Sequence, residues 1–166
     1  NKLTSAGDTM CGTCLSSIQK STLKRLQREY DRKFSEKKII SDFYSSFVFE
    51  KDKELQHAIH SLKYDNKFPI GIFLGKTIAN KFTSNRPDWN IDLIIPIPLH
   101  QLKKAERGYN QAYYIAKGVS KILRVKVSDR IVKRVKYTAS QTTMNLNERE
   151  ENISGAFKVK NKNAVS

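Results

Sequence analysis

The chain has 166 residues, of which 39% are hydrophobic and 28% are charged, and its formal net charge is +15. This size and composition allow one globular domain with a small appendage, and they exclude a membrane-spanning helix because no apolar run approaches ~18 residues. So large a positive charge favours polyanionic partners such as nucleic acid, phosphorylated metabolites or an acidic protein.

The N-terminal part carries the two cysteines of the chain, Cys11 and Cys14, in the C-x-x-C spacing of half a zinc knuckle. Tetrahedral zinc usually takes four such ligands, so the pair predicts either a zinc half-site or two unpaired thiols. His57 and His60 offer further nitrogen ligands, but two histidines spaced H-A-I-H on a helix more often lie on the surface. Because two cysteines cannot build a disulfide framework, we expect a cytoplasmic location.

The apolar pattern predicts alternating helices and strands. A basic helix over residues 15–38 and the cysteines form a small N-terminal element, residues 1–41. Residues 42–166 predict the main domain, with these elements in chain order: a strand at 43–49, helices at 51–64 and from Pro69, a strand at 91–97, a helix at 110–123, short strands near 125–127 and 130–135, and a last strand at 156–159. Such alternation is typical of an α/β sandwich, whose ligands bind at the carboxyl ends of strands.

The apolar segment 91–97 predicts a strand covered on both faces in a parallel sheet. Pro96 cannot donate a ladder hydrogen bond and Pro98 interrupts the strand again, so we expect a rigid turn there. Beyond it we expect a basic loop and then the free N–H groups of the next helix. Together they predict a phosphate or pyrophosphate site built from Pro98, Leu99, His100, Lys103, Lys104, Arg107, Gly108, Asn110 and Gln111. The alternative is a strand–turn–helix crossover whose basic residues face only water.

The polar segment at 136–154 is long for a connection. Its hydrogen-bonding side chains, Gln141, Asn145, Arg149 and Asn152, fit a mobile flap that closes over a bound anion. The stretch NLNEREEN fits a short solvated helix with capping residues equally well.

Basic residues are concentrated in one part of the chain, since residues 101–137 hold 11 basic and 2 acidic residues. The later part of this run predicts a surface for single-stranded DNA, made of Lys117, Lys121, Arg124, Lys126, Arg130, Lys133, Arg134 and Lys136. Tyr109, Tyr113 and Tyr114 lie beside it and offer rings for base stacking, but packing in the core or at its rim is the expected role for two of them.

Three segments of the chain resemble the ComF family of competence proteins, which are phosphoribosyltransferase-like. They are IIPIPLH followed by ERGYNQA, the later QTTMNLNEREENISGAF, and HSLKY at residues 60–64. The resemblance spans about residues 9–159. It implies a type I phosphoribosyltransferase fold, a parallel sheet flanked by helices with an N-terminal zinc-binding element. It also implies a role in DNA uptake during natural transformation, on single-stranded DNA with a helicase-like partner.

The same resemblance implies roles for individual residues. The turn at 98–100 and the basic segment through Arg107 would face the pyrophosphate of phosphoribosyl pyrophosphate, which is bound with Mg²⁺. Arg107 would stabilise the departing diphosphate with Lys103 or Lys104, and Arg149 would arrive with the flap. Proteins of the family usually carry a later Asp-Asp…Thr-Thr-Gly motif and a second cysteine pair. This sequence lacks both, so we expect the chain as given to bind the sugar phosphate poorly and not to catalyse. A DNA-binding accessory without transfer and a nucleobase salvage enzyme are the alternatives.

Overall fold

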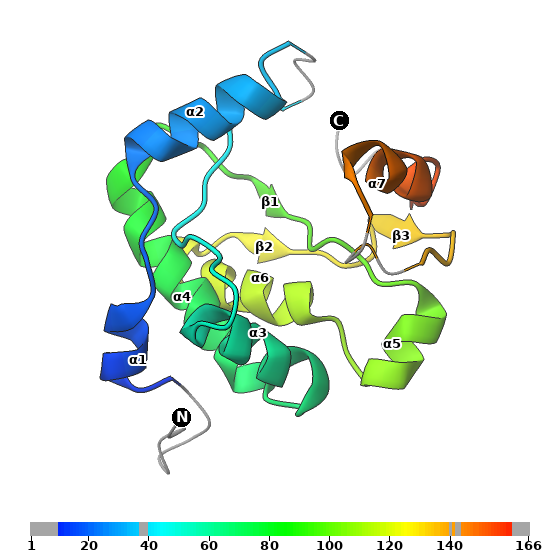
Figure 1. Cartoon of the computed structure of the whole chain (residues 1–166), viewed down its shortest axis with the longest axis horizontal. Coiled ribbons are helices and arrows are strands. Elements are labelled where there is room, and N and C mark those ends of the chain that lie inside the picture. Colours follow the sequence, from blue (N-terminus) through cyan, green and yellow to red (C-terminus); the bar gives the residue numbers. More distant parts are fainter. Residues whose placement is uncertain (1–9, 37–39, 140, 142–143, 161–166) are drawn as a thin grey trace.

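The computed structural model describes residues 10–36, 40–139, 141 and 144–160 (Figure 1). In chain order its elements are α1 (Gly12–Ser17), α2 (Leu23–Lys33), α3 (Glu54–Tyr64), α4 (Phe68–Asn85), β1 (Leu93–Ile94), α5 (Gln101–Arg107), α6 (Gln111–Leu123), β2 (Lys126–Val127), β3 (Val132–Arg134), α7 (Leu146–Ile153) and β4 (Phe157–Val159). None of the helices in this described part has the length and apolar character to span a bilayer.

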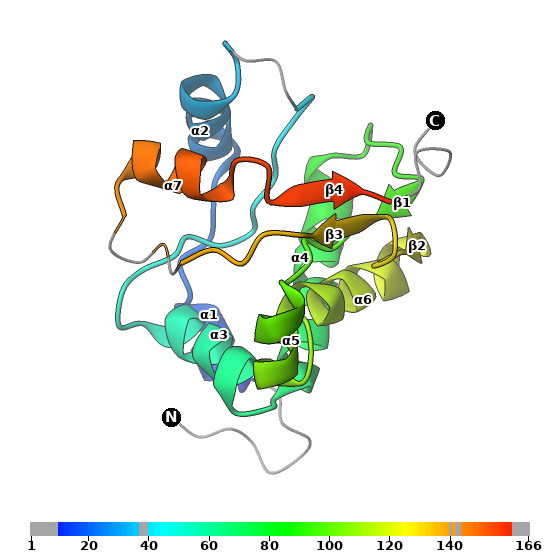
Figure 2. The same ribbon diagram turned by 90° about the vertical axis from the view of Figure 1, so that its right-hand side faces the viewer.

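The strands form two separate pairs. β1 pairs with β2 in parallel, with Leu93 opposite Lys126, and β3 pairs with β4 antiparallel, with Lys133 opposite Lys158. Figure 2 shows the second pair side by side, with α7 leading into β4. The expected mixture of helices and strands is therefore confirmed. Within the described residues the parallel sheet has two strands, so a larger parallel sheet of the phosphoribosyltransferase type is not confirmed.

Helices α4 and α6 form the most intimate contact in the molecule because glycines let their backbones touch. A Cβ on Gly75 would collide with the carbonyl oxygen of Ile115, and a Cβ on Gly118 would collide with that of Ile72. Helix α6 also packs against β2, so this pair supports the parallel strands. The core continues as a cluster of buried side chains from α3, α4 and the residue that ends α1: Ile18, Leu55, Ala58, Ile70 and Leu74.

The expected helix over residues 15–38 is wrong, because the chain forms two helices there. Ile18 ends α1 in an extended conformation, and the side chain of Thr22 accepts a hydrogen bond from the Arg25 N–H to begin α2. The residues between run beside the segment predicted as a strand at 43–49. That segment makes an isolated bridge between Lys20 and Phe47 rather than a regular strand. Residues 19–21 therefore pair with a distant segment instead of continuing the helix.

The strand predicted at 91–97 is also shorter than expected. Regular pairing covers Leu93 and Ile94, and both are half-buried, so the expected coverage of both faces is wrong. The reason is that β1 has one neighbouring strand, β2, in the described part of the chain. The position of the parallel strand is nevertheless as predicted, and irregular chain leads from it to α5.

Candidate functional site

The chain beyond the carboxyl end of β1 is held by one asparagine. Pro96 is buried, whereas Ile97 is 65% exposed, so the proline turn opens to solvent. Asn110 donates a hydrogen bond from its Nδ2 to the carbonyl oxygen of Ile97 at 2.9 Å. Its Oδ1 accepts one from the N–H of Ala112 at 3.1 Å, which caps α6. The turn and the beginning of α6 are thereby joined.

The segment predicted as a basic loop is helix α5, so that prediction is wrong. His100 caps it, because its Nδ1 accepts from the N–H of Leu102 at 3.3 Å, and Gly108 ends it with a φ of 74°. Residues four apart on a helix share a face, so Lys103 and Arg107 lie along one side of α5. The left-handed conformation at Gly108 is the ordinary way to end a helix and explains the glycine.

Each of these two cations rests on a tyrosine ring. The Nζ of Lys103 lies 5.5 Å from the ring centroid of Tyr137, and the ring of His100 packs edge-on against the same tyrosine. The guanidinium of Arg107 lies 5.2 Å from the ring centroid of Tyr64 and donates a hydrogen bond of 3.4 Å to its hydroxyl. Neither cation forms an ion pair with a carboxylate among the described residues, so their charges remain available to an anion.

Gln111 begins α6 and is almost completely buried, with 8% of its surface exposed. Its Nε2 has no hydrogen-bond partner among the residues that the structure describes. Most buried polar groups are hydrogen-bonded, so an unsatisfied amide next to a helix N-terminus indicates a place where an acceptor would be stabilised. Sequence reasoning included Gln111 in the site, and the structure places it beside Asn110.

The segment predicted as a flap contains α7. The side chain of Asn145 accepts from the N–H of Glu148 at 3.0 Å, and the side chain of Glu148 accepts from the N–H of Asn145 at 2.8 Å, which forms a capping box. Arg149 donates to the carbonyl of Met144, and Asn152 donates to that of Ala139. These contacts agree with the capped-helix interpretation.

Gln141, at the beginning of the segment predicted as a flap, is half-buried. Closure of this segment over an anion, and a role of Gln141 in it, stay predictions. An open depression of about 570 Å³ lies beside α7 and is lined by Met144, Asn145, Asn147 and Arg149.

The basic residues predicted for DNA come from α6, β2, β3 and the segments between them. Seven are exposed: Lys117, Lys121, Arg124, Lys126, Arg130, Lys133 and Lys136. Arg134 differs, because it is half-buried with its guanidinium 5.4 Å from the ring of Phe157 and hydrogen-bonded to Thr138. Its Nε is buried and has no hydrogen-bond partner in the described part of the chain. Arg134, the last residue of β3, therefore packs against the last strand and is less exposed than the other seven.

The three tyrosines near this run are half-buried, as expected for packing at the rim of the core. The ring of Tyr114 contacts the rings of Tyr109 and Tyr113. The hydroxyl of Tyr109 donates to the carbonyl of Leu62, and burial raises the pKa of this phenol above its usual value. The sequence marked Tyr64 only as part of the HSLKY segment and did not place it in the site. Its contact with Arg107 was missed because no local signal shows which cation packs against this ring.

The two cysteines lie at the beginning of α1, where the N–H of Cys14 donates to the Sγ of Cys11 at 3.3 Å. This hydrogen bond lowers the pKa of the Cys11 thiol, and the thiol contact raises that of Cys14. His57 and His60 are exposed on α3. No three His, Cys, Asp or Glu side chains gather into a metal-binding group within the described residues, so zinc binding stays a prediction.

Comparisons with known proteins agree with the motifs. Over 106 residues the chain is 31% identical to Competence protein F of Haemophilus influenzae, which covers 62% of this chain and 46% of that protein. The resemblance to the ComF family is confirmed. The chain is also 27% identical over 108 residues to DNA utilization protein YhgH of Escherichia coli and of Shigella flexneri, covering 63% of this chain and 48% of each relative.

The chain spans about half the length of the curated relatives that it matches. No family model and no solved structure matches it. Within the described part, the ComF-like motif at residues 107–111 is the junction between α5 and α6. Arg107 is the last residue of α5, Gly108 ends that helix, Tyr109 follows it, Asn110 caps α6 and the buried Gln111 is the first residue of α6.

Proposed function

We propose that the protein takes part in the uptake or use of DNA, and that it binds phosphoribosyl pyrophosphate and single-stranded DNA. The DNA role is supported by the relation to proteins named for competence and DNA utilization. The proposal that phosphoribosyl pyrophosphate binds is supported by the position of residues 107–111. They lie beyond the carboxyl end of a parallel strand, which is where α/β proteins bind their ligands.

The chemistry of this junction suits a diphosphate. Arg107 and Lys103 present positive charge from one face of α5, and the first N–H groups of α6 add a partial positive charge. In a phosphoribosyl transfer the departing diphosphate gains negative charge, and fixed cations stabilise it without moving. Mg²⁺ would enter with the diphosphate, because phosphate oxygens are among the ligands that this ion prefers.

Calorimetry of the intact protein with phosphoribosyl pyrophosphate and Mg²⁺ tests this ligand. Replacing Arg107 by Ala should raise the Kd at least tenfold, because a charge-assisted hydrogen bond to phosphate is lost. Arg28→Ala is the matched control, because Arg28 is an exposed arginine on α2, away from α5 (Figure 1). An Arg107→Ala protein that binds as tightly as the wild type would remove Arg107 from the site. If the wild-type protein does not bind phosphoribosyl pyrophosphate, the proposed ligand is wrong.

The seven exposed basic residues around α6 and β2 support single-stranded DNA as the second ligand. Phosphate contacts release counterions, so the logarithm of the association constant should fall linearly with the logarithm of salt concentration. Replacing both Lys121 and Lys133 by Gln should make this slope shallower by about 1 to 2. A salt-independent affinity would contradict binding through this surface. Association with a helicase-like partner stays a prediction.

A further inference from the structure

Two aromatic side chains at the turn between α3 and α4 are exposed. Tyr64, the last residue of α3, is 58% exposed, and Phe68, the first residue of α4, is 44% exposed. The three-residue turn between them has Asn66 at a φ of 56°, and the N–H of Phe68 donates to the Asn66 carbonyl at 2.9 Å. The two rings are therefore displayed from helix ends joined by a short, hydrogen-bonded turn.

The exposed ring of Phe68 is supported from behind. The ring centroid of Tyr114 lies 4.9 Å from that of Phe68, and the two ring planes are tilted by 31°. Tyr109 packs against Phe68 edge-on, and its hydroxyl is bonded to the carbonyl of Leu62. Two tyrosines thus pack against Phe68 while 44% of its surface stays exposed. Such a supported ring loses little conformational entropy when a planar group stacks on it.

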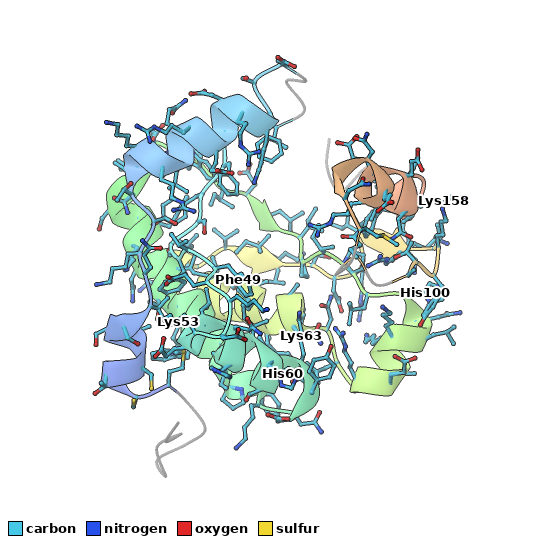
Figure 3. All side chains as sticks on the ribbon, viewed as in Figure 1. Phe49, Lys53, His60, Lys63, His100 and Lys158 are labelled. Atoms are coloured by element: carbon cyan, nitrogen blue, oxygen red, sulfur yellow. The ribbon has the colours of Figure 1, made fainter. Side chains whose placement is uncertain are left out.

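Cations surround these rings. Arg107 lies on Tyr64, and the Nζ of Lys117 lies 5.4 Å from the ring of Tyr113 and 5.9 Å from that of Tyr114. The ring of His60 lies 4.7 Å from that of Tyr64. Figure 3 shows His60 and Lys63 on α3, the helix that Tyr64 ends. Asp65, in the turn, is the acidic residue next to Tyr64 in the chain.

We infer that Tyr64 and Phe68 form a stacking surface for the bases of single-stranded nucleic acid, with Arg107 and Lys117 beside it for the phosphates. Stacked rings next to cations are the usual means of binding single strands without sequence preference. The mixture of exposed rings and positive charge, on a chain of net charge +15, fits a polyanion better than an apolar protein partner. This inference rests on the proposed function and assigns to it a surface separate from the basic residues on β2 and β3.

Fluorescence anisotropy with a labelled oligodeoxythymidylate, measured over a range of salt concentrations, separates the two kinds of contact. Tyr64→Ala combined with Phe68→Ala should weaken binding at least tenfold while the salt slope stays the same, because stacking releases no counterions. Tyr64→Phe should keep wild-type affinity, since the ring remains. Phe49→Ala is the control, because Phe49 is 61% exposed and precedes the other end of α3.

The outcomes distinguish this inference from the function on which it rests. If the wild type binds the oligonucleotide and the double variant binds equally well, the stacking surface is wrong and DNA binding stands. If the wild type does not bind at any salt concentration, both fall. A Phe49→Ala protein that loses as much affinity, or a duplex that binds as tightly as the single strand, would also overturn the surface. Should Phe68→Ala unfold the protein, Tyr64→Ala alone should still weaken binding, because its ring is mostly exposed.

Discussion

The α4–α6 pair and the two peripheral helices α5 and α7, which we call the rim, are built on opposite principles. In the pair, Gly75 and Gly118 bring two backbones into contact, and Ile70, Leu74 and Ala79 of α4 are almost fully buried. In the rim, α5 has no buried residue, and its cations rest on tyrosine rings rather than in the core. The pair therefore carries stability, and the rim carries the groups that can meet an anion.

This division has a consequence for mutations. Changes in the pair should lower the free energy of unfolding and affect ligands only through loss of fold. Changes in the rim should leave the free energy of unfolding nearly unchanged and affect ligands directly. The following variants test that contrast, from the largest expected effect to the smallest.

Gly118→Val should have the largest effect. Its side chain would collide with the carbonyl of Ile72, so we expect a loss of about 3 kcal/mol or more in the free energy of unfolding, measured by urea denaturation. Gly12→Ala is the control, because no atom of the described residues lies within 4 Å of a Cβ on Gly12, and it should change stability by less than about 1 kcal/mol. Equal effects of the two changes would show that the helix pair can separate freely.

Tyr109→Phe should have the next largest effect. It should lower the free energy of unfolding by about 1 to 2 kcal/mol, because the Leu62 carbonyl loses the hydroxyl that donates to it. Burial raises the pKa of Tyr109 in the folded state, so the unfolded chain loses this proton first as the pH rises. The stabilising contribution is thus complete below about pH 10, the unfolded value, and declines above it. The difference in unfolding free energy between wild type and variant should therefore shrink above pH 10. A difference that grew would contradict the buried, protonated phenol.

Asn145→Ala should act locally. The change removes the capping box of α7 and should cost about 1 kcal/mol, seen as faster amide hydrogen exchange in α7. Asn145→Ser keeps a capping oxygen and should exchange nearly as slowly as the wild type. If exchange in α4 accelerated as much as in α7, the rim would not be a separate unit.

Lys104→Ala should have the smallest effect on folding, below about 0.5 kcal/mol, because Lys104 is exposed on α5. The same variant should weaken binding of phosphoribosyl pyrophosphate by a few-fold in calorimetry, since one positive charge near the diphosphate is lost. A large loss of thermal stability in this variant would place Lys104 in the structure of the domain rather than at its ligand.

The contrast between the two regions also explains what sequence reasoning could reach. Periodic apolar residues predict α3, α4 and α6, because burial of one helix face repeats every three to four residues. Helix α5 has no buried residue, so it leaves no such pattern; its signals are the cap at His100 and the glycine at its end. The candidate residues at 107–111 were found because basic residues and a glycine lie between a strand ended by prolines and the beginning of a helix, and because they match a family motif.

Contacts between distant segments were beyond the sequence. The pairing of Lys20 with Phe47 and the separation of the strands into two sheets depend on which segments meet in space. The same is true of the contact between Tyr64 and Arg107, since 43 positions separate the two residues in the sequence. Local propensity carries no information on such contacts.

The central claim is that a diphosphate binds where α5 ends and α6 begins. Amide chemical shifts of the intact protein, measured by NMR during titration with phosphoribosyl pyrophosphate and Mg²⁺, test it most directly. We predict that the largest changes fall on the backbone amides of Gly108, Asn110 and Gln111, and that Arg107→Ala shifts them to at least tenfold higher ligand concentration. Shifts confined to other helices, or no shifts at saturating ligand, would contradict the account.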